Sequence, residues 1–239
     1  MQTRSKFGLR AAACCVVGAM LALPQLVQAG AELPSTGETI DIDYLLPPED
    51  GGVRRWRVRT SEGAELRKTP AADAEITKLL GQGDVLTNFG CTPGAGQVWC
   101  EVRPFQGGPK GFVSATRLEP ASGPDGTIPT GVDDSRKRAR KRDFDARGDI
   151  RCAQEKGQSL GGCTAAIARS GGGDATVAVT FPNGFVRQLY FTHGTFISAS
   201  ATMSGVGRDT EWRMERGLHL IRVDDQRFEI SDRLVFGPR

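Results

Sequence analysis

The feature that most constrains the fold of this chain is a series of short segments in which apolar and polar residues alternate. Near residue 55 the alternation is strict: Arg55, Arg57 and Arg59 fall on one side, and Trp56 and Val58 on the other. An alternation with a period of two predicts β-strands with one buried face. Similar segments, separated by turn residues, recur almost to the end of the 239 residues, so the sequence predicts an all-β protein.

Two neighbouring strand segments each carry a cysteine on their apolar face. Cys91 is in phase with Phe89, and Cys100 is in phase with Val102. An antiparallel hairpin that places Cys91 opposite Cys100 also places Phe89 opposite Val102, and both cysteines then face the core. A disulfide here closes a loop of about ten residues, which stabilises a small fold by roughly 2–3 kcal/mol in the chain-entropy model.

The cysteines as a set indicate an oxidising compartment. Of the six cysteines, Cys14 and Cys15 lie in a predicted signal peptide and four remain. An even number in an exported chain favours disulfides. No C-x-x-C motif is present, and neither His193 nor His219 has ligand spacing to a cysteine, so we predict no metal site and no cofactor. Local pairing within each candidate domain is favoured: Cys91–Cys100 and Cys152–Cys163.

The first 29 residues have the layout of a secretory signal peptide. Three basic residues precede the apolar stretch Ala11–Leu23, which is too short for an ordinary membrane-spanning helix. The mature chain is therefore predicted to be periplasmic or secreted, without a transmembrane segment. Changes of composition divide the chain into a signal peptide at 1–29, a flexible leader at 30–52, a first β-domain at 53–120, a linker with a basic run at 121–143 and a C-terminal β-domain at 144–239.

The first β-domain carries the residue spacing of a known family. In order, the matching residues are Leu66-Arg67, Pro70, Gly83-Asp84-Val85, Trp99-Cys100-Glu101-Val102, Gly111-Phe112-Val113 and Leu118. This order resembles the bacterial SH3 (SH3b) domain. The resemblance implies an SH3-like barrel, and it implies a binding module of the cell envelope rather than a catalyst.

The same resemblance implies candidate ligand contacts. SH3b relatives bind short peptides of peptidoglycan in a groove lined by aromatic and polar side chains, which suits an extended peptide. Trp99 and Phe112 occupy the family's two tryptophan positions, although the phenyl ring at position 112 lacks an indole N–H donor. Trp56 is a third candidate contact. Packing within the barrel is the alternative role for Trp56 and Trp99.

The predicted linker contains the highest local charge of the chain. One interpretation of this run is a solvated, self-repelling tether. The other is contact with an anionic surface, such as an envelope polymer or lipid headgroups. No aromatic residue interrupts the run, so base stacking and specific nucleic-acid binding are not expected. The candidate contact residues are Arg136, Lys137, Arg138, Arg140, Lys141 and Arg142.

The C-terminal domain is predicted to be a second small antiparallel β-meander or barrel. An irregular segment bridged by Cys152–Cys163 is expected before it, followed by Gly171-Gly172-Gly173 as a flexible entry. The residues 182–184 are typical of a hairpin turn. Strands are expected at 175–181, 185–192, 195–201, 211–215, 218–223 and 226–230.

No catalytic residues are predicted. His193 is predicted to fall in a turn and His219 on a strand face, and no nucleophile motif accompanies either of them. The sequence therefore predicts a non-catalytic cell-envelope binding protein that recognises peptidoglycan peptide or a related ligand. The alternative is a protein–protein interaction module, such as an envelope scaffold or an inhibitor of a wall-degrading enzyme.

Overall fold

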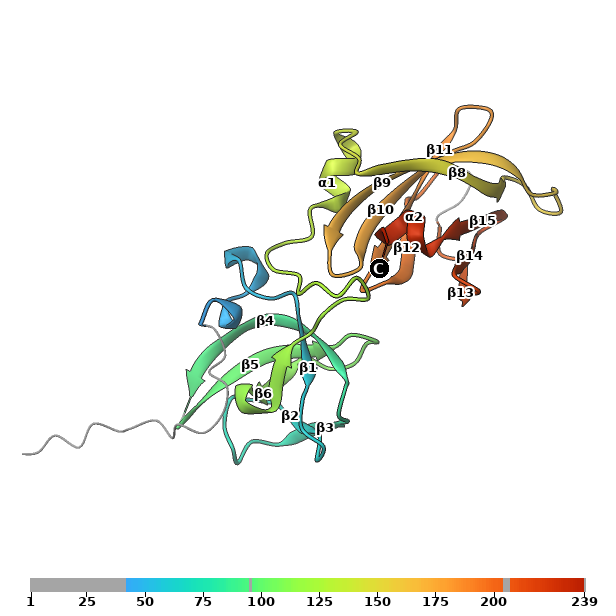
Figure 1. The fold of residues 1–239 in the computed structure, drawn as a ribbon. Coiled ribbons are helices and arrows are strands. Elements are labelled where there is room, and N and C mark those ends of the chain that lie inside the picture. Colours follow the sequence, from blue (N-terminus) through green and yellow to red (C-terminus); the bar gives the residue numbers. More distant parts are fainter. Residues whose placement is uncertain (1–41, 95, 204–206, 239) are drawn as a thin grey trace, which may run out of the picture. The chain divides into compact units, whose positions relative to one another are not determined.

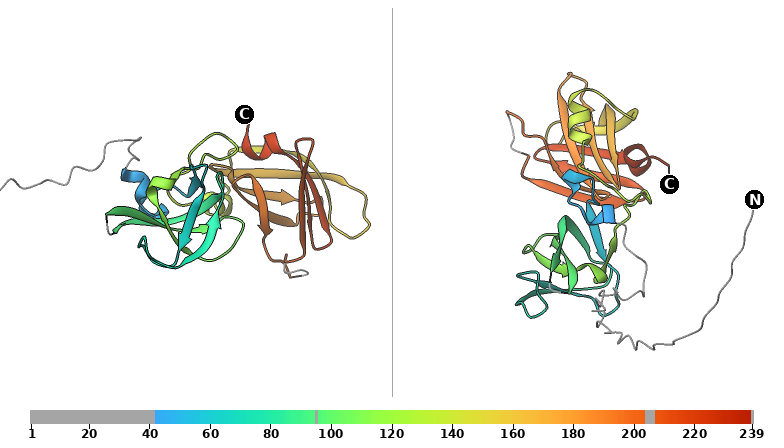
Figure 2. Two further views of the ribbon diagram at one scale, coloured as in Figure 1. Left: turned by 90° about the horizontal axis from the view of Figure 1, so that it is seen from below. Right: turned by 90° about the vertical axis from the view of Figure 1, so that its left-hand side faces the viewer.

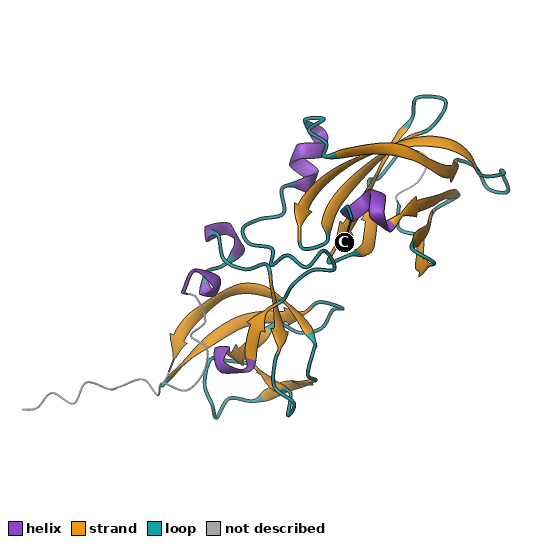
Figure 3. Ribbon diagram, in the orientation of Figure 1, coloured by secondary structure: helices purple, strands orange, loops and turns teal. Residues whose placement is uncertain are grey.

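The computed structural model describes residues 42–94, 96–203 and 207–238. Within these residues the protein is almost entirely β-structure with a few short helices (Figure 3). The strands form two antiparallel sheets, one in each half of the described chain (Figure 1). The all-β prediction is confirmed. The predicted signal peptide lies outside the described residues, and no described helix is long and apolar enough to span a bilayer.

The first sheet has seven strands in the spatial order β3-β2-β6-β5-β4-β1-β7 and forms a nearly closed barrel. Strands β3 and β7 are its two edges. Its strands and short helices are η1 Ile42–Leu45, η2 Pro48–Asp50, β1 Arg55–Val58, β2 Ala64–Arg67, β3 Ile76–Leu80, β4 Val85–Gly94, β5 Gln97–Pro104, β6 Gly111–Ser114, η3 Ala115–Arg117 and β7 Leu118–Pro120.

The barrel core is built from one face of each strand, as the alternation predicts. Trp56 and Val58 on β1 are buried in this core, and Arg57 between them is half-exposed. Leu66 and Leu118 are fully buried in the same cluster. The apolar sequence period thus fixes which face of β1 points inward.

The β4–β5 hairpin differs from the prediction in one respect. Cys91 lies opposite Cys100 and the two form a disulfide, as predicted. Val102, however, lies opposite Asn88, because a bulge interrupts the register between Asn88 and Cys91. The prediction that Phe89 opposes Val102 is therefore wrong. The bulge shifts the alternation by inserting unpaired residues, so Asn88 is buried and Phe89 is not part of the barrel core.

The second sheet has eight strands in the order β12-β11-β10-β9-β8-β15-β14-β13 and is strongly curved (Figure 2). The strands predicted between residues 175 and 230 are present. Five buried phenylalanines form much of its core, together with aliphatic residues of both sheet halves. The elements are β8 Ala146–Ala153, β9 Gly161–Gly171, β10 Asp174–Thr180, β11 Val186–Thr192, β12 Thr195–Ala199, β13 Thr210–Glu215, β14 Leu218–Val223, β15 Gln226–Ser231 and the helix α2 Asp232–Phe236.

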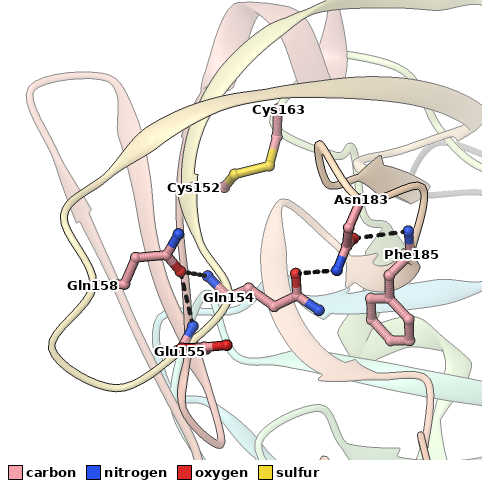
Figure 4. Close-up of a disulfide and its surroundings, with 7 residues drawn as sticks. All are labelled: Cys152, Gln154, Glu155, Gln158, Cys163, Asn183 and Phe185. Atoms are coloured by element: carbon pink, nitrogen blue, oxygen red, sulfur yellow. Dashed lines mark hydrogen bonds between the residues drawn. A yellow bond between two sulfur atoms is a disulfide. The ribbon is translucent and has the colours of Figure 1, made fainter.

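Strands β8 and β9 occupy the segment that was expected to be irregular. They form a long antiparallel hairpin, which the Cys152–Cys163 disulfide joins near its closed end. In the loop between them, the Gln158 side-chain oxygen accepts hydrogen bonds from the backbone N–H groups of Gln154 and Glu155, at 2.7 and 3.0 Å (Figure 4). The predicted pairing of these cysteines is confirmed, and the expectation of an irregular segment is wrong. The alternation is hidden because β9 is rich in alanine and glycine.

The segment 121–143 includes a short helix, α1 Ser135–Arg140, that packs on β9 and β10. Ser135 is buried, and its hydroxyl lies 3.0 Å from that of Thr176 on β10. This helix covers the outer face of β10, which explains why nearly the whole of β10 is buried. The basic run is therefore held against the second sheet rather than extended as a tether.

The end of the predicted leader is also structured. Residues 42–50 form η1 and η2, and Tyr44 and Leu45 pack against the barrel core. The buried Asn88 side chain donates hydrogen bonds to the carbonyl oxygens of Leu46 and Val53, at 3.0 and 2.8 Å. The amide that the bulge turns inward thus anchors the chain on both sides of η2.

A buried ionic cluster joins β1 to β10. The carboxylate of Asp174 is completely buried and accepts hydrogen bonds from Arg54 Nη1 at 2.8 Å and from Arg55 Nη2 at 2.6 Å. The backbone N–H of His193 donates to the same carboxylate at 2.9 Å. Arg54 also donates to carbonyl oxygens of Gly131 and of its neighbours in the 121–143 segment. This cluster fixes a strand of the first sheet to a strand of the second.

Candidate functional site

Trp99 lies on the outer face of the barrel, although it is almost fully buried. Its partner across the β5–β6 ladder is Ser114, while the next pair, Cys100 and Val113, lies in the core. Successive residues of a strand point to opposite faces. Trp99 and Ser114 therefore face outward together. Trp99 is nevertheless only 3% exposed, so other parts of the chain must cover its ring.

Gly94 and the turn at Pro70 provide this cover. A Cβ atom placed on Gly94 would lie 2.5 Å from Cδ1 of Trp99 and 3.0 Å from the carbonyl oxygen of Pro70. Only the absence of a side chain at position 94 lets the indole lie flat against the end of β4. The indole Nε1 is buried and has no hydrogen-bond partner within the described part of the chain. An unpaired buried donor of this kind is unusual in folded proteins.

A groove of about 460 Å³ runs beside Trp99. Its walls come from β2, β3, β5, β6 and η3. The lining combines apolar side chains, hydroxyl and amide groups, and charged groups of both signs. The lining residues are Glu62, Gly63, Ala64, Glu65, Arg67, Ala72, Leu79, Leu80, Gln97, Trp99, Val113, Ser114, Thr116 and Arg117.

Polar groups in the groove are already oriented. The Ser114 hydroxyl donates to Gln97 Oε1 at 2.6 Å and lies 2.9 Å from the Thr116 hydroxyl. Arg67 donates to the carbonyl oxygen of Ala74 at 2.7 Å and forms an ion pair with Glu65. These contacts hold side chains that can both donate and accept hydrogen bonds along one wall of the groove.

A loosely joined ion pair lies at the rim. Arg117 Nη1 is 3.6 Å from Glu62 Oε2, and both side chains are largely exposed. The pKa of the Glu62 carboxyl is lowered, first by a hydrogen bond from its own backbone N–H and then by one from the Ser61 hydroxyl. Glu62 therefore keeps its charge in mildly acidic solution. Exposed pairs of this kind contribute little to stability, so both groups are available to a ligand.

The three aromatic residues predicted to bind a ligand lie in different environments. Trp99 lines the groove. Phe112 is half-buried on the same outer face, opposite Glu101, and is not part of the groove lining. Trp56 is fully buried in the barrel core. Of these three residues, Trp99 alone lines the groove. Trp56 packs within the barrel core, which was the alternative role predicted for it.

The six basic residues of the predicted anionic-surface contact lie on or just after α1. Arg138 is bound at its guanidinium by Asp143 and Asp145, at 2.8 and 2.7 Å. These hydrogen bonds raise the pKa of Arg138 and lower the pKa values of both carboxyls. The other five residues are exposed: Arg136, Lys137, Arg140, Lys141 and Arg142.

The two histidines lie in or near packed regions. His219 is completely buried, and its Nδ1 accepts a hydrogen bond from Trp212 Nε1 at 3.2 Å. Its Nε2 lies 3.3 Å from Asp232, so the proton of the neutral ring belongs on Nε2. His193 is half-buried, and burial, followed by the charge of Arg55, lowers its pKa. Full burial of His219 supports a structural role for this residue.

A second hollow of about 450 Å³ lies in the C-terminal sheet beside Trp212. One of the three arginines that line it, Arg222, is already bound by Asp209 at 2.7 Å and by Glu211 at 2.8 Å. In the groove beside Trp99, the charged groups of Glu62 and Arg117 are largely exposed and only loosely paired. The Trp99 Nε1 donor has no hydrogen-bond partner among the described residues. This groove is therefore the candidate site.

Sequence reasoning identified Trp99 but missed the charged residues of the groove. Arg67 falls within the SH3b-like pattern and Glu65 directly precedes it, which could have directed attention to them. Glu62 and Arg117 carry no local signal. Comparisons with family models, with curated proteins and with solved structures find no match to this chain.

Proposed function

We propose that the protein is a non-catalytic binding protein of the cell envelope whose barrel groove holds a short peptide of peptidoglycan. The groove beside Trp99 is the observation that carries this proposal, because it combines a tryptophan with largely exposed charges of both signs at its rim. Peptidoglycan peptides present carboxylates, an ammonium group and small apolar side chains. Arg117 would bind a carboxylate, and Glu62 would bind an ammonium group.

The unpaired indole N–H of Trp99 gives the proposal a directional contact. An extended peptide exposes backbone carbonyl oxygens at regular intervals, and one of them would satisfy Trp99 Nε1 after a small shift of the turn at Pro70. Leu79, which also lines the groove, is 73% exposed and would contact a small apolar side chain of the peptide. Both charges at the rim then fix the direction of the chain.

Sedimentation with purified sacculi tests the proposal. The mature protein, with both disulfides formed, should be retained at low salt. Arg117→Glu should weaken retention by about tenfold or more, because it replaces a charge-assisted hydrogen bond with a repulsion. Arg103→Glu, which reverses an exposed charge outside the groove lining, is the matched control. Absence of retention by the folded protein would reject the proposal.

The edge strand β3 favours a second candidate, a protein partner. Ile76 and Leu79 on this strand are 44% and 73% exposed, and β3 pairs only with β2. An exposed edge with apolar side chains can accept a strand from another protein. Such a scaffold or inhibitor role predicts that a soluble protein, and not sacculi, competes for the β3 edge. Lys78→Pro would then abolish partner binding by blocking the edge while Arg117→Glu would not.

A further inference from the structure

The basic residues on and after α1 form an ordered array, which we call the α1 basic face: Arg136, Lys137, Arg140, Lys141 and Arg142. Each of the five is exposed, and no ion pair joins any of them to another described residue. Surface cations in a protein usually alternate with acids. This face is therefore a strong local concentration of positive charge.

The helix beneath this face is fixed to the second sheet. Ser135 and Ala139 are buried against the sheet, and Arg138 bridges Asp143, Asp145 and the carbonyl oxygen of Arg169. Residues four apart in a helix are neighbours. Ser135 and Ala139 thus form the face of the helix that packs on the sheet, and the exposed cations lie on its other faces.

The spacing of the cations opposes helix stability. Arg136 and Arg140 are four residues apart within α1, and like charges at this spacing destabilise a helix. Lys137 and Lys141 have the same spacing, with Lys141 at the C-cap. Arg136 is partly compensated, since its guanidinium lies 3.8 Å from the ring centroid of Tyr190. The interaction of cations in the last turn with the helix dipole offsets part of this repulsion. The cations remain exposed, so their charge is available to a partner.

The shape of the face selects the kind of partner. None of the five residues lines any of the hollows described for the structure. The cations are exposed along and just after α1 and do not surround one of these hollows. No aromatic ring among them is free to stack on a base, because the ring of Tyr190 lies under Arg136. A membrane surface supplies many mobile phosphate headgroups that can adjust to such an array.

We propose that the α1 basic face docks the protein on a membrane surface rich in anionic phospholipid. This inference is independent of the groove, because the two sites share no residue. Binding is electrostatic and reversible, and it weakens as salt screens the charges. Each basic residue near such a surface contributes about 1 kcal/mol, or about fivefold in affinity.

Vesicle sedimentation tests the inference with the full mature protein. Vesicles of phosphatidylglycerol and phosphatidylcholine in equal parts should bind the protein, and phosphatidylcholine vesicles should not. The double variant Lys137→Gln/Lys141→Gln should bind about 25-fold more weakly, at about fivefold per cation. The matched control Lys68→Gln/Lys156→Gln removes two exposed lysines elsewhere and should change binding less than about twofold.

Three results would overturn the inference. Equal losses in the two double variants would show that net charge, and not this face, governs binding. Absence of binding to the anionic vesicles at low salt would exclude a lipid surface. Tighter binding to duplex DNA than to the vesicles, at equal phosphate concentration, would assign the face to a nucleic acid. Sacculus retention is measured separately, so failure here leaves the groove proposal intact.

Discussion

Replacing Asp174 with asparagine should destabilise the protein more than any other conservative change at a polar residue. The carboxylate is completely buried and is the shared partner of Arg54 and Arg55, at 2.8 and 2.6 Å. Asparagine keeps the size of the side chain but removes the negative charge. Two buried guanidinium groups then lack a counter-charge, and loss of one partner from a buried ionic group costs about 3–5 kcal/mol.

The two arginines should not be equivalent. Arg54 donates five further hydrogen bonds besides the one to Asp174, whereas Nη1 of Arg55 is buried without a hydrogen-bond partner among the described residues. Arg54→Met should therefore cost at least about 2 kcal/mol more than Arg55→Met. Removal of Arg55 leaves one cation for one carboxylate and eliminates an unsatisfied donor.

Urea unfolding of the oxidised protein, followed by tryptophan fluorescence, measures these free energies. Asp149→Asn, an exposed aspartate on β8, is the matched control and should change the free energy of unfolding by less than about 0.5 kcal/mol. A loss below about 1 kcal/mol for Asp174→Asn, or equal losses for the two arginine variants, would refute the assigned role of the cluster.

Three further changes have defined outcomes. Replacing Cys91 and Cys100 together with serine should lower the free energy of unfolding by roughly 2–3 kcal/mol, and an unchanged urea midpoint would contradict this. The pKa of His193 is lowered in the folded protein, so the unfolded chain binds a proton at higher pH and the free energy of unfolding should fall as the pH drops below about 6.5. His193→Asn, in which asparagine tolerates the positive φ at this position, should flatten this part of the stability profile. An unaltered profile would show that His193 is not the source of this pH dependence. Because Arg138 lowers the pKa of Asp145, this ion pair stabilises the folded protein above the ordinary aspartate pKa, and the stabilisation is lost as the pH falls through the lowered pKa. The protection factors of the α1 amides, which are corrected for the intrinsic slowing of exchange by acid, should accordingly fall at acidic pH in the native protein, and Arg138→Gln should show low protection already at neutral pH.

Local patterns in the sequence predicted the strands that have one polar and one apolar face. Trp56 and Val58 were placed inward correctly, and both disulfides follow from strand phase and sequence proximity. The bulge after Asn88 was not visible, because a register shift leaves the residue types of both strands unchanged. Strand β9 was missed because alanine and glycine carry little periodic signal.

Contacts between distant segments were beyond sequence reasoning. Arg54 and Asp174 are 120 residues apart, and a charged residue in a strand is normally assigned to the surface. The basic run was judged by its charge, which favours a solvated segment, whereas Ser135 and Ala139 anchor it. In the candidate site, the family resemblance identified Trp99. The charges of Glu62 and Arg117 come together only through the fold.

An NMR titration that follows the tryptophan indole N–H signals is the most direct test of the groove proposal. The chain has three tryptophans: Trp56 is in the barrel core, Trp99 lines the groove and Trp212 is in the second sheet. Addition of a soluble peptidoglycan peptide should shift the Trp99 indole signal as it gains a hydrogen-bond acceptor, while the signals of Trp56 and Trp212 stay in place. Gly94→Ala, which displaces the Trp99 ring, should abolish the shift. A saturating titration that leaves the Trp99 signal unmoved, or that moves only Trp212, would contradict the proposal.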